Sequence, residues 1–128
     1  MTPEIEQAIA EIQIAFPEHP IGVEAESQGG AYVIVNNLLI GEQYLPSTSW
    51  VGFLITFQYP HADVYPHFID GQLRRVDGSL IQGNGLSGSM TWQERQAIQV
   101  SRRSNRLNPA IDTAATKLAK VLTWLRNQ

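Results

Sequence analysis

The hydrophobic pattern of this chain changes twice, from helical spacing to strand-like runs and back to helical spacing. The first apolar set has gaps of four, three and four residues: Ile5, Ile9, Ile12 and Phe16. This spacing places all four side chains on one face of a helix. Thr2 can cap that helix, Pro3 suits its first position, and Pro17 ends it. We therefore expect a helix from Pro3 to Phe16.

A second helical pattern lies near the other end of the sequence. Asn108 and Pro109 form another cap-and-proline start. An apolar stripe follows at helical spacing: Ile111, Ala115, Leu118, Val121, Leu122 and Leu125. We expect a helix that begins at Pro109.

Short runs rich in Val, Ile, Tyr and Phe fill the middle of the chain. They cover residues 21–26, 31–40, 50–57 and 66–69. Gly29-Gly30 is a turn signal between the first two, and the runs predict four successive antiparallel strands. After Asp70 the glycines from Gly71 to Gly88 are too dense for regular elements, so we expect turns and irregular backbone there.

The three tryptophans fall in different parts of this pattern. Trp50 opens a predicted strand and Trp124 extends the last helix, so we expect both in the core. Trp92 lies in the irregular stretch, where it either anchors the segment or shields a reacting group from water. Anchoring is the preferred interpretation.

The order of helix, strand meander, irregular stretch and helix is typical of an α+β fold, in which a helix covers one face of an antiparallel sheet. A chain of 128 residues is long enough for one core, so we expect a single domain over residues 1–128. The hydrophobic share of 43% and the charged share of 16% are those of a globular protein rather than a disordered one.

Several classes of protein are excluded by what the chain lacks. No apolar run approaches the roughly 20 residues of a membrane span, and the opening MTPEIEQ is acidic, unlike a secretory or mitochondrial signal. We therefore expect a cytoplasmic protein outside the membrane. The chain has no cysteine, which excludes disulfides, thiolate metal sites and thiol nucleophiles. With three histidines, a zinc site would also need carboxylates, so we expect no metal and no cofactor.

Charge is divided unevenly along the chain. Residues 1–70 hold nine carboxylates and no lysine or arginine, whereas residues 71–128 hold all nine basic residues and three acids. This division predicts either a bipolar surface that steers a charged partner or, if the fold interleaves the halves, a mixed surface.

Two segments of the chain carry a family resemblance. One is GFLITFQYPHADVYPHFI at residues 52–69, and the other is LNPAIDTAATKLAKVLTWL at residues 107–125. They resemble, respectively, the third strand, aromatic-proline segment and fourth strand of the ubiquitin-conjugating enzyme superfamily, and the exit of its active-site loop into a crossing helix. Leu107 stands where that family has a tryptophan. The likeness to a bacterial member spans nearly the whole chain and implies the conjugating-enzyme fold: an amino-terminal helix, a four-stranded meander, an active-site loop and a crossing helix.

The family's catalytic motifs are absent here. There is no His-Pro-Asn triplet and no cysteine. Counted back from Pro109, the family's cysteine position falls at or near Gln99, and the nearest hydroxyls belong to Ser101 and then Ser104. The resemblance therefore leaves two interpretations open, of which the first is preferred.

In the first interpretation, Ser101 or Ser104 accepts the carboxyl terminus of a ubiquitin-like protein as an oxyester. A serine needs a base to become nucleophilic, and His61 and His67 are the candidates. Three arginines can hold a carboxylate or stabilise the oxyanion: Arg102, Arg103 and Arg106. The amide of Asn105, or that of Asn84, is a candidate oxyanion donor in place of the missing triplet.

In the second interpretation, the chain has lost catalysis and binds a ubiquitin-like protein or an activating enzyme. The resemblance implies these two partners, and allows a peptidase that matures the modifier. A third possibility is nucleic acid, because the cluster SRRSNR can attract phosphate backbones. Three arginines are few and the net charge is −3, so we do not expect a nucleic-acid partner.

Overall fold

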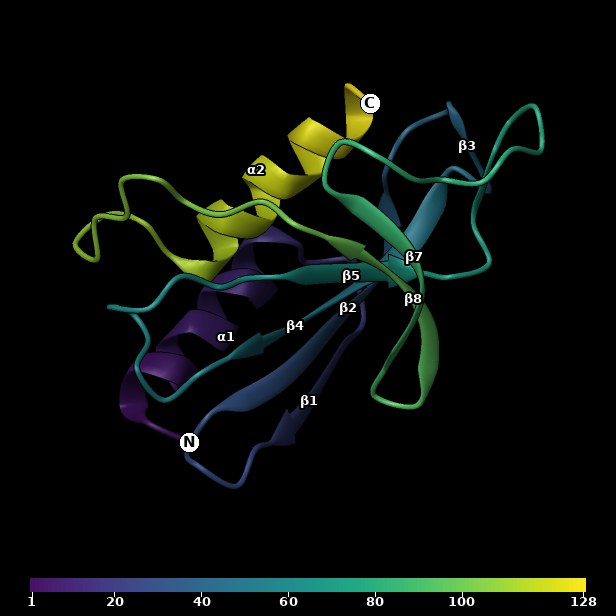
Figure 1. The fold of residues 1–128 in the computed structure, drawn as a ribbon. Helices are drawn as coiled ribbons and strands as arrows, with labels where there is room; N and C mark the ends of the chain where they lie inside the picture. Colours follow the sequence, from purple (N-terminus) through teal and green to yellow (C-terminus); the bar gives the residue numbers. More distant parts are fainter.

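The computed structural model describes residues 1–128 and has the α+β class that the sequence predicts (Figure 1). The elements are α1 (Pro3–Ala15), β1 (Ile21–Ala25), β2 (Ala31–Leu39), β3 (Tyr44–Leu45), β4 (Thr48–Ile55), β5 (His67–Asp70), β6 (Arg74–Arg75), β7 (Leu86–Trp92), β8 (Arg95–Val100) and α2 (Ala114–Arg126). Six strands form an antiparallel sheet in the order β1-β2-β4-β5-β8-β7, and β3 pairs with β6 separately.

Helix α1 confirms the first sequence pattern. Its N-cap is Thr2, whose side chain accepts a hydrogen bond of 3.2 Å from the backbone N–H of Ile5. The acidic side chains Glu4 and Glu6 lie in the first turn, where their negative charges interact favourably with the positive end of the helix dipole. The apolar face is buried as expected, at Ile5, Ala8, Ile9 and Ile12.

Helix α2 begins five residues later than the sequence suggested, at Ala114 rather than Pro109. The expected cap, Asn108, instead closes a turn in which its backbone N–H donates to Asp112 and its side chain accepts from Ala110. The helix starts at a reciprocal capping box between Thr113 and Thr116, which satisfies two of its free N–H groups. The prediction of the start was wrong because Asn108 and Pro109 belong to this separate turn rather than to the first turn of the helix.

The predicted meander is present as β1, β2, β4 and β5, which pair antiparallel in chain order. The expectation of irregular backbone after Asp70 is confirmed for most of residues 71–85, where β6 is a two-residue strand. It was wrong beyond them, since β7 and β8 follow there. Strands β7 and β8 form a hairpin that pairs with β5 and extends the sheet to six strands. Its turn residues, Gln93 and Glu94, have φ of 49° and 63°, as a tight hairpin requires.

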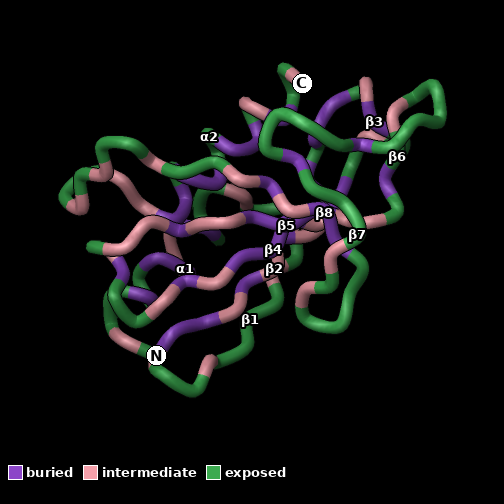
Figure 2. Tube along the Cα trace, viewed as in Figure 1, coloured by how far each residue is buried: buried purple, intermediate pink, exposed green.

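Both helices lie on one face of the sheet, and α1 packs against α2 (Figure 1). Alternate residues of the central strands point into this layer, for example Val33, Val35, Val51 and Phe53, all of which are inaccessible to solvent. Figure 2 shows the central strands largely buried, whereas β1 at the sheet edge is largely exposed. Neither 13-residue helix is long and apolar enough to cross a membrane.

The tryptophans differ from expectation at one position. Trp50 lies on the sheet face opposite the helices, stacked with Trp92 at 6.1 Å between ring centroids, and is therefore not in the main core. Trp92 also stacks on Phe68 at 5.1 Å, which supports its predicted anchoring role. It pairs with Arg95 at the turn end of the hairpin, whereas Ser101 follows the opposite end, so shielding of a reacting serine is the wrong interpretation. Trp124 packs against the core as predicted.

The β3–β6 pair holds the carboxyl end of α2. The Gln43 amide donates to the carbonyls of Leu125 and Arg126 at 3.0 and 2.9 Å, and the Tyr44 hydroxyl donates to Leu125 at 2.8 Å. Burial raises the pKa of Tyr44, against the influence of Arg75, so its hydroxyl remains a donor. These bonds satisfy helix-end carbonyls that lack partners within the helix.

Candidate functional site

The segment that carries the predicted site residues connects β8 to α2 and runs beside the first half of that helix (Figure 1). Ser101 and Ser104 are half-buried within it, while Arg102, Arg103 and Arg106 are exposed. The fold thus brings the two serines and three arginines into one loop against α2, and what each serine touches decides what the loop can do.

Ser104 belongs to a compact polar cluster with Asp63 and Lys117. The Lys117 Nζ donates to both Asp63 carboxylate oxygens at 3.1 and 3.0 Å and to the Ser104 Oγ at 2.8 Å. The Ser104 hydroxyl donates to Asp63 Oδ1 at 3.0 Å, and its backbone N–H donates to Oδ2 at 2.7 Å. The cluster fastens the loop to the segment before β5 and to α2.

The chemistry of this cluster argues against a nucleophilic Ser104. A lysine amine that donates three hydrogen bonds carries three protons and has no lone pair with which to accept another. Burial alone would raise the pKa of Asp63, but the Ser104 backbone bond and the Lys117 ammonium group lower it overall. A carboxylate with a lowered pKa is a weak base, so neither neighbour activates the hydroxyl.

Ser101 has different surroundings. Its Oγ accepts a hydrogen bond of 3.0 Å from the Gln99 amide, and its backbone N–H donates to the carbonyl of Gly85 at 2.8 Å. The phenol of Tyr65 lies beside it, and the Ser101 hydroxyl and then Arg103 lower the pKa of that phenol. The Arg103 guanidinium carbon lies 4.4 Å from the centre of the Tyr65 ring.

The structure joins neither candidate histidine to a serine. His61 is exposed, with no side-chain hydrogen bond. His67 is wholly inaccessible in β5, its ring lies 5.1 Å from that of Phe53, and neither ring nitrogen has a hydrogen-bond partner. Burial, and secondarily the charge of Lys117, lowers the pKa of His67 to about 3, while Asp63 opposes this shift. His67 is therefore a neutral core residue at physiological pH.

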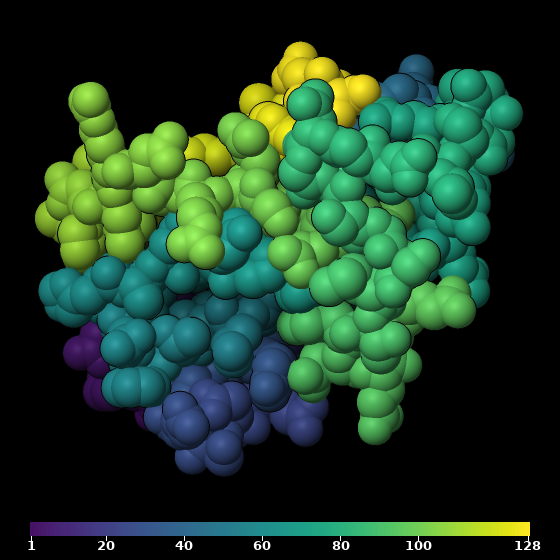
Figure 3. All heavy atoms as spheres, viewed as in Figure 1, coloured from purple at the N-terminus to yellow at the C-terminus, as the bar shows by residue number.

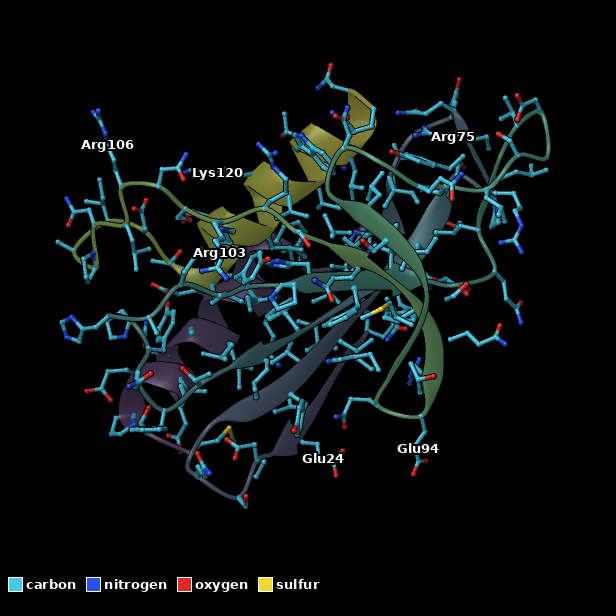
Figure 4. All side chains as sticks on the ribbon, viewed as in Figure 1. Glu24, Arg75, Glu94, Arg103, Arg106 and Lys120 are labelled. Atoms are coloured by element: carbon cyan, nitrogen blue, oxygen red, sulfur yellow. The ribbon has the colours of Figure 1, made fainter.

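A groove of about 310 Å³ lies between the loop and the outer side of α2. We call it the arginine groove, lined on the loop side by Arg102, Arg103, Ser104, Asn105 and Arg106, and on the helix side by Lys117, Lys120 and Trp124, among others. Figure 4 shows Arg106 projecting outward from the loop tip and Lys120 on α2. The Arg102 guanidinium carbon lies 4.7 Å from the centre of the Trp124 ring, a cation–π distance.

The loop arginines have no acidic partner. The ion pairs of the structure are Lys117 with Asp63 and Lys120 with Asp112, and none involves Arg102, Arg103 or Arg106. Asn105 lines the groove, whereas the side chain of Asn84 donates to Gln128 at 3.3 Å. The groove therefore presents net positive charge and suits an anionic group.

Four residues of the site are absent from the sequence-based set: Asp63, Tyr65, Lys117 and Lys120. Lys117 left a signal, because it falls on the apolar face of the last helix, next to Leu118, where a charge requires a buried partner. The identity of that partner, Asp63, depends on a contact across 54 residues and had no local signal. No three histidine or carboxylate side chains are grouped so that they could hold a metal ion.

Comparison of the chain with protein-family models, curated proteins and solved structures gave no match. The conjugating-enzyme resemblance therefore depends on the sequence segments alone.

Proposed function

We propose that this chain is a conjugating-enzyme-like binding module that holds an acidic partner in the arginine groove and forms no ester. The observation that carries this proposal is the contrast within one loop. Three arginines face solvent without any carboxylate partner, while Ser104 is held by an ammonium group and a carboxylate that cannot activate it.

The partners in this proposal follow from the sequence resemblance. They are a ubiquitin-like protein and an activating-enzyme-like protein, in the cytoplasm. Two features of the fold are compatible with it: a meander of β1, β2, β4 and β5 follows α1, and α2 follows the loop that carries the arginines. The added β7–β8 hairpin departs from the expected four strands.

The test is a binding titration with a ubiquitin-like protein and an adenylating enzyme from the same genome. The double variant Arg102→Glu/Arg103→Glu should weaken binding at least tenfold, because two attractive charges become repulsive ones. Arg74→Glu is the matched control, since Arg74 is also exposed but lies outside the groove, and it should change affinity less than twofold. Equal loss in both variants would indicate a non-specific charge effect and contradict the proposal.

A second candidate function is favoured by one observation, the position of Tyr65 beside Ser101. A phenol with a lowered pKa is a possible base for the Ser101 hydroxyl, and Arg103 could stabilise the oxyanion. In this case Ser101 would accept the modifier's carboxyl terminus as an oxyester.

Intact mass spectrometry separates the two functions. The protein is incubated with the modifier, the adenylating enzyme and ATP, then treated with thiol reductant and, separately, with hydroxylamine. The binding proposal predicts no adduct. A reductant-resistant, hydroxylamine-sensitive adduct that disappears in Ser101→Ala and is slowed in Tyr65→Phe, but persists in Ser104→Ala, would instead establish the oxyester.

A further inference from the structure

The arginine groove contains more basic side chains than acidic side chains that pair with them. Lys117 directs its three protons to Asp63 and Ser104, so this pair contributes no net charge. Lys120 lies 3.6 Å from Asp112, which offsets its charge. The three loop arginines remain uncompensated, within a chain whose overall charge is −3.

Two of these arginines lie against aromatic rings and have no carboxylate partner. Arg102 lies against Trp124 and Arg103 against Tyr65, at 4.7 and 4.4 Å from the ring centres. A guanidinium group stacked on a ring keeps its N–H donors available at its edges. Arg102 has no carboxylate partner and keeps its donors free for a ligand, whereas Arg103 also bonds the Tyr65 hydroxyl and keeps its remaining N–H donors free.

The size of the groove limits the ligand. A volume of about 310 Å³ is at the lower end of the range for small-molecule sites, which runs from about 300 to 1,000 Å³. It exceeds what a single carboxylate or phosphate needs. Three uncompensated charges likewise call for a ligand that carries several negative charges within a short span.

We propose that the arginine groove binds the diphosphate or triphosphate group of a small molecule. Each phosphate offers several acceptor oxygens to the forked donors of arginine, and a short phosphate chain offers enough of them for more than one loop arginine. Arg106 at the loop tip supplies a further cation at the rim (Figure 4). The same chemistry fits free pyrophosphate and a nucleoside triphosphate, which the experiment distinguishes.

This inference concerns the groove of the proposed function and adds a regulator to it. A polyphosphate in the groove would cover the arginines that attract the acidic partner, so the two ligands should compete. The small-ligand measurement needs no partner protein. If pyrophosphate does not bind, the proposal of partner binding is unaffected. If the partner protein does not bind, the proposal of a phosphate site is unaffected.

The experiment is calorimetric titration of the wild-type protein at low ionic strength with sodium pyrophosphate, ATP, adenosine and citrate, each alone. Pyrophosphate and ATP should bind with one site per chain, whereas adenosine should not bind and citrate should bind at least tenfold more weakly. If ATP binds no more than threefold more tightly than pyrophosphate, the phosphate chain is the recognised group. Affinity should fall steeply as NaCl is raised, because the contacts are ionic.

Variants locate the site. Arg102→Gln and Arg103→Gln should each weaken pyrophosphate binding at least fivefold, and Arg102→Lys should give a smaller loss, because it keeps the charge but not the fork. Arg74→Gln should change affinity less than twofold. Amide NMR spectra of each variant establish that the fold is retained, and shifts on adding pyrophosphate should concentrate in residues 101–106 and the exposed side of α2.

Four results would overturn the inference. They are absence of pyrophosphate binding to the wild type, binding that both Arg102→Gln and Arg103→Gln leave unchanged, citrate binding as tight as pyrophosphate, and ATP binding without pyrophosphate binding. The third would mean a general polyanion surface, and the fourth would mean recognition of the nucleoside.

Discussion

At the scale of single residues, the surroundings of His67 and Ser104 determine what each side chain can do. His67 sits in a predicted strand, and its complete burial follows from the pairing of β5 between β4 and β8. The Ser104 hydroxyl was singled out as a nucleophile, yet its environment depends on Lys117 and Asp63, which lie far from it in sequence. Local pattern cannot supply such contacts.

The buried His67 predicts a loss of stability in mild acid. Its pKa is about 3 in the folded protein and 6.5 in the unfolded chain, so between these values the unfolded chain binds the extra proton. The contribution of neutral His67 to the free energy of unfolding is fully present above pH 6.5. It is lost as pH falls toward 3, by about 1.4 kcal/mol per pH unit at most. Urea unfolding of the wild type between pH 7 and pH 4 measures this slope.

The variant His67→Leu should flatten this part of the pH profile. The lowered pKa of Asp63 affects stability in a more acidic pH range. The stabilisation by ionised Asp63 is present above pH 3.8 and is lost only as pH falls below it. A slope that persists between pH 6.5 and 4 in His67→Leu would contradict the account.

The Asp63–Lys117 pair predicts an asymmetric response to mutation. Asp63→Asn should lower the free energy of unfolding by about 2 to 3 kcal/mol, because it leaves the largely buried ammonium group of Lys117 without its counter-charge. Adding Lys117→Met should restore part of the loss. Asp112→Asn, in the more exposed pair with Lys120, should cost less than about 1 kcal/mol in the same denaturation measurement.

At the scale of elements, the strongest predictions were those with a clear hydrophobic period. Helix α1 and the strands β1, β2, β4 and β5 were found near their expected bounds. The β7–β8 hairpin was missed because β7 is mostly exposed and polar, and its turn is Gln93-Glu94 rather than a glycine-containing pair. Its pairing with β5 is a tertiary contact that no local period reveals.

The position of this hairpin depends on a glycine in β4. A methyl group at Gly52 would overlap the ring of Trp92, which lies across the outer face of the sheet. Gly52→Ala should therefore displace Trp92 and destabilise the protein by about 1 to 3 kcal/mol, as overpacking does. Gly22→Ala is the matched control, because no atom lies within 4 Å of the added methyl group there.

Denaturant unfolding and hydrogen exchange of β7 and β8 amides measure this effect. Faster exchange confined to the hairpin in Gly52→Ala, and unchanged in Gly22→Ala, is the expected result. Equal stability of Gly52→Ala and the wild type would mean that Trp92 does not depend on the space above Gly52.

At the scale of the whole molecule, α+β class and helix-first order followed from sequence periodicity, but the six-stranded sheet did not. On the face shown in Figure 3, residues of the N-terminal half fill the lower left, while residues of the C-terminal half cover most of the upper side and the lower right. The arginine groove lies within the basic half. A basic groove of this kind can orient an acidic partner before contact, which makes association sensitive to salt.

The most direct test of the binding account is the dissociation constant for the ubiquitin-like partner, compared between Arg102→Glu/Arg103→Glu and Ser101→Ala. The account predicts at least a tenfold rise for the double charge reversal and a change of less than twofold for Ser101→Ala, because the arginines bind and the serine does not react. Unchanged affinity in the charge-reversed protein would contradict it.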